Sequence, residues 1–385
     1  MVRLGDVVRI EASSQKTVGD RFWLLNLDMV EQQTGNIIDY NYVGKGALNG
    51  SIIQFDTGCV LYSKLRPNLN KVVIPSQDGF ATSEMLPLRP NTKLLTREYL
   101  TVFLRSDSFV TWAVSKTAGA KMPRLGSKEL LGKEIPLPSI SEQIRIAGQF
   151  AKVDELISLR KEQLAKLDQL VKSRFVELFG DPMENPMGWD RVNISAVVGG
   201  KVSNGFFAKR DDYRDDGNVK VLGVAHVVNR MYSNTEDLPK TNGTELDVVK
   251  YGVTYGDMLF CRSSLVAAGI GKASIVPKGT PNNVLFECHV IRLPLDLNKC
   301  VPEFMQVLST TDYFRNQVIA QSKTATMTTI GQDGILKTDI ILPPMELQKK
   351  FLTFVEQTDK SKLAIHQSLD KLELLKKSLM QEYFE

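Results

Sequence analysis

The sequence has few residues that bind metal ions or form covalent cross-links. Its 385 residues include four cysteines and three histidines. The cysteines are scattered and form no Cys-x-x-Cys pair, so we expect free thiols in a reducing cytoplasm and no zinc site. No stretch approaches the roughly twenty uncharged apolar residues of a membrane-spanning helix, and the N-terminus lacks the apolar core of a signal peptide. These absences predict a cytoplasmic protein.

The common signatures of catalytic loops are also missing. The stretch 269–273 comes nearest to a phosphate-binding P-loop, but Val266 stands where the first glycine belongs and Ala273 where the hydroxyl belongs. The sequence has no Gly-x-Ser-x-Gly elbow and no His-Glu-x-x-His motif. Residues 181–183 resemble the start of an amino-methyltransferase loop, but the second proline and the stacking aromatic are absent. We therefore expect a chain that is not an enzyme.

Strong net charge is absent as well. The formal net charge is +4, with 24% charged and 43% hydrophobic residues. These values are typical of a globular protein and exclude a non-specific nucleic-acid coat, which would be far more basic.

What the sequence does contain is a long internal repeat. Residues 83–143 align with 288–348 without a gap, at a constant offset of 205; Glu98 pairs with Glu303 and Gln143 with Gln348. The offset is far longer than the roughly 20–50 residues of a solenoid unit. The repeat therefore predicts two whole domains with an approximate twofold relation.

Each predicted domain is β-rich and is followed by a long helix. Short apolar runs bounded by Gly, Asp and Pro indicate strands, and one helix is expected in each domain, near 97–114 and 302–320. The first long helix opens at Ser139, with Glu142 completing a capping box. The second begins near Met345 and runs to the C-terminus. Each holds roughly 38 residues, or about 55–60 Å.

Both long helices carry an apolar stripe at heptad spacing. In the first helix the stripe includes Phe150, Ile157, Leu164, Val171 and Leu178. An exposed stripe of this length needs a partner, so we expect the helices to pair antiparallel as a coiled coil. In the alternative, each helix packs on its own domain. The second helix has lysines, at 362 and 376, where the first has Ile157 and Val171, so the seam is asymmetric.

Four segments resemble specificity subunits of type I restriction–modification enzymes. Residues 135–146 (IPLPSISEQIRI) are similar to the central region of that family, an entry into a spacer helix that ends near 179–182 (FGDP). Residues 341–348 (ILPPMELQ) resemble its distal region, and 61–72 (LYSKLRPNLNKV) resemble a strand and loop of its target recognition domains. The resemblance covers the whole chain, in order.

The resemblance implies an α+β fold with two β-rich target recognition domains in a pseudo-twofold arrangement, separated by an antiparallel coiled coil. The domains would span residues 1–138 and 181–342, and the helices 139–180 and 343–385. Each domain would contact one half of a split, asymmetric DNA sequence, and the helices would act as a ruler between them.

The resemblance also implies partners. Two modification subunits carrying S-adenosylmethionine would methylate adenine, and restriction subunits using ATP and Mg²⁺ would translocate and cleave DNA. The chain itself would bind double-stranded DNA and hold no cofactor or metal.

Candidate DNA contacts are side chains that donate to base edges or phosphates. In the first domain these are Lys64, Arg66, Asn68, Lys71, Lys116, Lys121 and Arg124. In the second domain they are Ser203, Asn204, Phe206, Lys209, Arg210, Arg262, Ser263, Ser264, Lys272, Lys323, Thr324 and Thr326. Lys272 aligns with Lys71, and the hydroxyl-rich run 322–328 aligns with the 116–124 region.

Two other functions are open at this point. A metal-dependent nuclease could use the acidic cluster at 211–216, although that loop lacks an acid-x-Lys partner. A coiled-coil scaffold would bind partner helices and no DNA. The two domains with basic loops argue against the scaffold.

Overall fold

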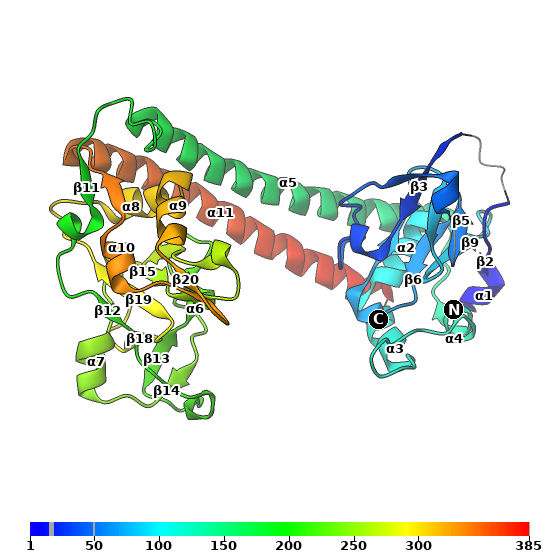
Figure 1. Ribbon diagram of the computed structural model, residues 1–385. Coiled ribbons are helices and arrows are strands. Elements are labelled where there is room, and N and C mark those ends of the chain that lie inside the picture. Colours follow the sequence, from blue (N-terminus) through cyan, green and yellow to red (C-terminus); the bar gives the residue numbers. More distant parts are fainter. Residues whose placement is uncertain (15–18, 49–50, 385) are drawn as a thin grey trace. The chain divides into compact units, whose positions relative to one another are not determined.

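The computed structural model describes residues 1–14, 19–48 and 51–384, in two compact units. Unit 1 comprises Met1–Glu162 and His366–Glu385, and unit 2 comprises Gln163–Ile365. Both boundaries fall inside the long helices α5 (Ile140–Phe179) and α11 (Met345–Phe384), so each unit contains a part of both helices (Figure 1). The expected division at 138, 180 and 342 remains a prediction.

Unit 1 is built on two four-stranded sheets. The first has the order β2-β9-β6-β7 and the second β4-β3-β8-β5. The bounds of the first sheet's strands are β2 Val8–Ile10, β9 Met85–Pro90, β6 Val60–Ser63 and β7 Val72–Val73. Those of the second are β4 Tyr42–Gly44, β3 Arg21–Leu25, β8 Gly79–Thr82 and β5 Ile52–Phe55. A short pair, β1 (Val2–Arg3) with β10 (Glu134–Ile135), ties the N-terminus to the segment before α5.

Unit 2 repeats this plan with additions. Its sheets have the orders β12-β19-β15-β17, β14-β13-β18 and β16-β21-β20, and β11 pairs with β22 as β1 pairs with β10. The bounds are β11 Arg191–Asn193, β12 Ser203–Asn204, β13 Val219–Leu222, β14 Lys240–Thr241, β15 Asp257–Cys261, β16 Ser263–Ser264, β17 Ala273–Ile275, β18 Val284–Phe286, β19 Val290–Pro294, β20 Lys323–Thr324, β21 Thr328–Thr329 and β22 Asp339–Ile341.

Three of the shorter helices in unit 1 recur 205 residues later in unit 2. In unit 1 they are α1 Leu4–Val7, α2 Arg97–Arg105, α3 Asp107–Ser115 and α4 Ser127–Gly132. In unit 2 they are α6 Val224–Val227, α7 Glu245–Tyr251, α8 Pro302–Ser309, α9 Asp312–Ala320 and α10 Gln332–Leu336. The single helix expected near 97–114 is two helices, because extended Ser106 caps α3 by accepting from the Phe109 N–H. Thr311 caps α9 in the same way and divides the helix expected near 302–320.

A buried glutamine fixes the start of each long helix. Gln143 of α5 accepts from the Thr96 N–H at 2.9 Å and donates to the carbonyls of Leu94 at 2.8 Å and Pro138 at 2.9 Å. Gln348 of α11 makes the same three bonds, 205 residues on, to Val301 at 2.8 Å, Lys299 at 3.4 Å and Pro343 at 2.8 Å. Both side chains are 0% exposed. At the N-terminus of α5, the Ser139 hydroxyl accepts from the Glu142 N–H, while the Glu142 carboxylate binds Arg145.

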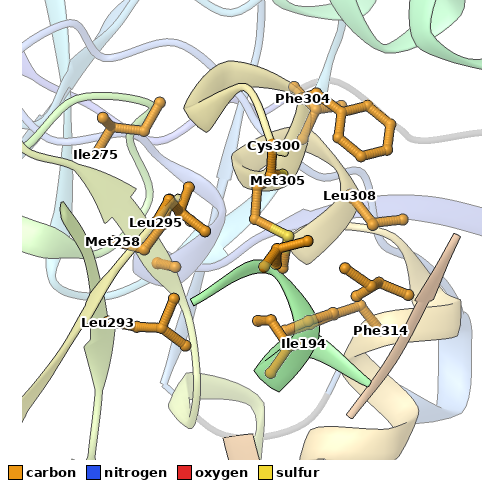
Figure 2. Close-up of a cluster of buried hydrophobic side chains, with 14 of the residues drawn as sticks. Ile194, Met258, Ile275, Leu293, Leu295, Cys300, Phe304, Met305, Leu308 and Phe314 are labelled. Carbon is orange, nitrogen blue, oxygen red and sulfur yellow. The ribbon is translucent and has the colours of Figure 1, made fainter. Parts of the chain in front are cut away.

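Each unit's core is completed by ends of both long helices. In unit 1, Phe150 near the start of α5 packs in one cluster with Met380 near the end of α11. In unit 2, Phe179 at the end of α5 packs against Phe351 near the start of α11. Figure 2 shows part of the unit 2 core, where side chains from strands and from α8 meet.

The two helices are antiparallel within each unit. In unit 1, Lys376 of α11 bonds Asp154 of α5 at 2.6 Å, and Tyr383 bonds Gln149. In unit 2, Lys362 bonds Asp168 at 2.7 Å. The expected antiparallel pairing is confirmed, and the two seam lysines are matched by aspartates on the opposite helix. The alternative, in which each helix packs only on the domain before it, is wrong.

No helix in the described part of the chain combines the length and apolar character needed to cross a membrane.

Candidate nucleic-acid interface

The structure joins the two basic segments of unit 1 into one surface. After β6 the chain continues beside residues 118–124, and isolated bridges link Leu65 to Arg124 and Ala118 to Arg124. The Arg66 N–H donates to the Pro123 carbonyl at 2.8 Å, and the Leu125 N–H donates to the Lys64 carbonyl at 2.9 Å. We call this arrangement of residues 64–66, 118 and 123–125 the unit 1 platform.

The unit 1 platform borders a hollow of about 590 Å³ with cationic walls. Lys64, Lys116 and Arg124 line it together with Glu129. Arg124 is not free to bind a ligand with its whole guanidinium group, because it holds Glu84 at 2.8 Å. This hydrogen-bonded arginine lowers the pKa of Glu84, so the pair stays charged near neutral pH. Arg124 therefore links the platform to Glu84, which offsets its charge.

The loop after β6 displays two of the predicted residues and turns a third inward. Arg66 and Asn68 are exposed, and Arg66 has a left-handed backbone, with φ of 50°. Lys71 instead donates to the Leu27 carbonyl, and burial lowers the pKa of its ammonium group. Lys71 is therefore held inside the loop, whereas exposed Lys121 lies on the segment that carries Arg124.

Unit 2 contains the same backbone arrangement as a small regular sheet. β16 pairs with β21 through Ser263 and Thr329, and β20 pairs with β21 through Lys323 and Thr329. These pairs are the counterparts of Leu65–Arg124 and Ala118–Arg124, because Lys323 and Thr329 each lie 205 residues further along. The Ile330 N–H donates to the Arg262 carbonyl at 3.0 Å, as Leu125 does to Lys64. We call residues 262–264, 323–324 and 328–330 the unit 2 platform.

The side chains on the two platforms differ. The backbone pairing places Arg262 where unit 1 has Lys64, and Ser264 where it has Arg66. Hydroxyl residues also stand where unit 1 has Lys121 and Arg124, namely Thr326 and Thr329. The side-chain oxygens of Thr324 and Thr328 lie 3.0 Å apart, and Lys323, Thr324 and Thr326 are exposed. The Arg262 guanidinium donates to the Cys288 carbonyl at 3.2 Å and is half-buried.

The remaining candidates of unit 2 lie on other elements. Ser203 and Asn204 form β12, which pairs with β19. The Phe206 ring packs edge-on against Tyr251, at 5.8 Å between centroids, and serves the core of that region. Lys209 and Arg210 are exposed on the following loop. Lys272 is the backbone counterpart of Lys71, and its ammonium donates to Asn229 at 2.7 Å.

Two carboxylates of the acidic cluster at 211–216 bind groups within their own loop. Asp216 binds Arg214 at 2.5 Å, and the Asp212 carboxylate accepts from the Lys209 N–H at 2.7 Å. The adjacent arginine lowers the pKa of Asp216. Among residues 1–14, 19–48 and 51–384, no group of three or more His, Cys, Asp or Glu side chains is placed to hold a metal ion. This geometry does not support the nuclease alternative.

Two exposed apolar residues beside the unit 2 platform were not among the contacts predicted from the sequence. Leu265 is 82% exposed and Val266 is 63% exposed, directly after β16. The sequence contains a signal for them: ten positions separate Arg262 from Lys272, whereas seven separate Lys64 from Lys71. The longer loop carries these side chains beside the hydroxyls of the platform.

Comparison with known proteins identifies a family. The family model described as "Type I restriction modification DNA specificity domain" matches residues 1–169 and 186–376. The EcoDI specificity subunit of a type I restriction enzyme from Escherichia coli is 28% identical over 154 residues, which cover 39% of this chain and 34% of that protein. The StySPI specificity subunit from Salmonella potsdam is 25% identical over 319 residues, which cover 77% of this chain and 66% of that protein.

Both matches span less than two thirds of the relatives' own lengths. A chain in a solved structure described as "Structural basis underlying complex assembly and conformational transition of the type I R-M system" has the same fold. Its TM-score is 0.58 at 17% identity, with 100% of this chain and 97% of that chain covered.

Proposed function

The chain belongs to the type I restriction modification DNA specificity domain family, and from this premise we propose that it reads a bipartite DNA target, one half with each unit. Each platform supplies donors for one half-site. Because the platforms differ in side chains, the two half-sites differ in sequence.

One observation carries this proposal. The two units share the backbone of the platform, down to the pairs Leu65–Arg124 and Ser263–Thr329, while the side chains displayed on it differ. Arginine and lysine favour hydrogen bonds to the guanine edge in the major groove, whereas serine and threonine hydroxyls form hydrogen bonds with different bases. A common frame with different donors suits recognition of two different sequences.

The partners and cofactors belong to the same proposal. Two modification subunits carrying S-adenosylmethionine would dock on this chain and methylate adenine within the target, and restriction subunits using ATP and Mg²⁺ would join them. The similar solved structure is described as concerning complex assembly in a type I system, which supports such an assembly. This chain would hold neither cofactor and would select the site.

The proposal is tested by removing one donor from each platform. We expect Arg66→Ala and Arg262→Ala each to weaken specific binding by about 1–3 kcal/mol and to relax preference within one half-site only. The readout is binding at fixed salt to a duplex selected from a random pool, with thermal melting to confirm that Arg262→Ala remains folded.

Arg66→Lys and Arg262→Lys are the matched controls, because lysine keeps the charge and loses the paired guanidinium donors. Relaxed sequence preference with retained affinity would indicate base reading; a change in affinity alone would indicate a phosphate contact. Unchanged binding by both alanine variants would remove the platforms from the interface.

A further inference from the structure

Unit 2 contains a second cationic site, away from the platform. A cavity of about 400 Å³ lies where α8 and α9 meet the long helices. The volume falls within the roughly 300–1,000 Å³ of small-ligand sites. Its charged lining consists of Lys172, Arg230, Lys272, Arg315, Lys362 and a single carboxylate, Asp168.

Most of this positive charge is not offset by a carboxylate. Lys362 is the exception, because it binds Asp168 at 2.7 Å and Asp359 at 3.7 Å. The other assigned bonds go to neutral oxygens: Lys272 to the Asn229 side chain at 2.7 Å, Arg230 to the Ala225 carbonyl at 3.3 Å, and Arg315 to the Ala268 carbonyl at 3.1 Å. Walls of one charge sign focus the field and attract a counter-ion.

One guanidinium in this lining has an unused donor. The Nη1 of Arg315 is buried and has no hydrogen-bond partner within the described part of the chain. Burial lowers the pKa of Arg315, which means that the protein around it does not stabilise its charge fully. Buried donors on charged groups normally have an acceptor, so this nitrogen can donate to a ligand oxygen.

The internal repeat shows that the fold does not need two of these cations. The counterparts of Arg315 and Lys362, 205 residues earlier, are Val110 and Ile157, both apolar. The counterpart of Thr310, another residue of the cavity wall, is Arg105, whose guanidinium donates to the Val72 carbonyl at 2.6 Å in unit 1. The same scaffold therefore folds without cations at the positions of Arg315 and Lys362, and their presence in unit 2 requires another explanation.

We propose that the cavity binds a phosphate group, and that its source is the backbone of the DNA read by unit 2. Clustered arginine and lysine donors are the usual protein ligands of phosphate. The assignment of a phosphate ligand rests on the geometry of the cavity alone. The assignment of DNA as its source rests on the proposed function. It gives unit 2 a salt-sensitive contact in addition to its platform.

The test compares Lys172→Gln and Arg230→Gln with Lys377→Gln in the full chain. Lys377 is the exposed repeat counterpart of Lys172 and lies outside the cavity lining. If each cation neutralises one DNA phosphate, its loss lowers the slope of log affinity against log salt by about 0.9. Lys377→Gln should keep the wild-type slope, and thermal melting checks that all three variants fold.

A second titration distinguishes the sources of phosphate. Inorganic phosphate and a short dinucleotide are titrated into the wild type and the double variant Lys172→Gln/Arg230→Gln by calorimetry. Loss of phosphate binding together with a lower salt slope supports the proposal in full. Loss of phosphate binding with an unchanged slope overturns the DNA source and supports a free phosphate compound.

If neither the slope nor phosphate binding changes, the cavity is not a phosphate site. If the proposed function is wrong, the wild type will show no sequence preference between duplexes. The phosphate titration will still show whether the cavity binds phosphate.

Discussion

The two units share the starts of their long helices and differ in the side chains of their platforms. Gln143 and Gln348 make the same three hydrogen bonds, and α5 and α11 each span 40 residues. On the platforms, in contrast, Arg66 is matched by Ser264. The loop from Arg262 to Lys272 in unit 2 is three residues longer than the loop from Lys64 to Lys71 in unit 1. The shared residues maintain the common fold of the two units, whereas the differing residues lie on the surfaces proposed to contact DNA.

The largest expected effect concerns the helix ends that complete each core. Phe179 is fully buried in unit 2, whereas its counterpart Phe384 is half-buried in unit 1, beside Tyr99 and Phe103. Phe179→Ala should destabilise unit 2 by about 3–5 kcal/mol, and Phe384→Ala should destabilise unit 1 by less. Calorimetric unfolding of both variants measures this; equal losses would show that the two cores use their helix ends alike.

A smaller and more symmetrical effect is expected at the glutamines. Gln143→Ala or Gln348→Ala leaves a buried backbone N–H and two carbonyls without their partner. We expect each to lose about 2–3 kcal/mol, since an unsatisfied buried group costs about 1–3 kcal/mol. Hydrogen exchange at the Thr96 and Val301 amides provides the local readout. A large loss in only one unit would contradict the equivalence of the two helix starts.

The exposed residues of the longer loop should act on one half-site only. If Leu265 contacts a thymine methyl group, replacing that thymine by deoxyuridine should cost about 0.8 kcal/mol, roughly fourfold in Kd. The same DNA change should not weaken Leu265→Ala further. Substitution of each thymine in turn, in both half-sites, is the measurement. An equal penalty in both proteins would place Leu265 outside the interface.

The last comparison is a pH dependence. Burial raises the pKa of the Glu303 carboxyl, whose Oε1 accepts from Tyr232 at 3.0 Å and Tyr255 at 3.2 Å. A raised folded-state pKa means that the folded unit binds the proton more tightly than the unfolded chain does. The resulting stability is present below the unfolded carboxyl pKa and is lost as pH rises through the folded value.

Glu303→Gln should therefore flatten the decline of unit 2 stability as pH rises from the acidic range towards neutrality. Its exposed counterpart Glu98 supplies the matched control, Glu98→Gln, which should leave the slope as it is. Thermal unfolding across this pH range measures both. An unchanged slope in Glu303→Gln would show that another group causes the dependence.

Much of the architecture could be predicted from the sequence, because the repeat and the heptad spacing can be recognised from residue identities alone. The start of α11 at Met345 and the antiparallel pairing of the helices follow from them. The breaks at Ser106 and Thr311 were missed, although each is a hydroxyl residue followed by aspartate, a typical helix start. Apolar residues at helical spacing both before and after Ser106 and Thr311 made each pair of helices resemble one continuous helix.

Apart from the pairing of the two long helices, the contacts between distant segments could not be predicted. No linear pattern shows that the end of α11 packs into unit 1, because an apolar stripe does not specify what covers it. The sequence identified Arg124 as a candidate contact, but its ion pair with Glu84 depends on the tertiary fold. Likewise, the cavity beside Lys272 is lined by residues from five separate segments of the chain, and spacing along the sequence does not predict that they meet.

The most direct test of the account is the DNA target itself. Genome-wide mapping of N6-methyladenine in cells that carry this chain with the proposed methyltransferase subunits should return an asymmetric sequence in two parts. A variant with the unit 2 platform residues Ser263, Ser264 and Thr324 replaced by alanine should alter one part and keep the other. A continuous or palindromic target, or a change in both parts at once, would contradict a chain whose two units read separately.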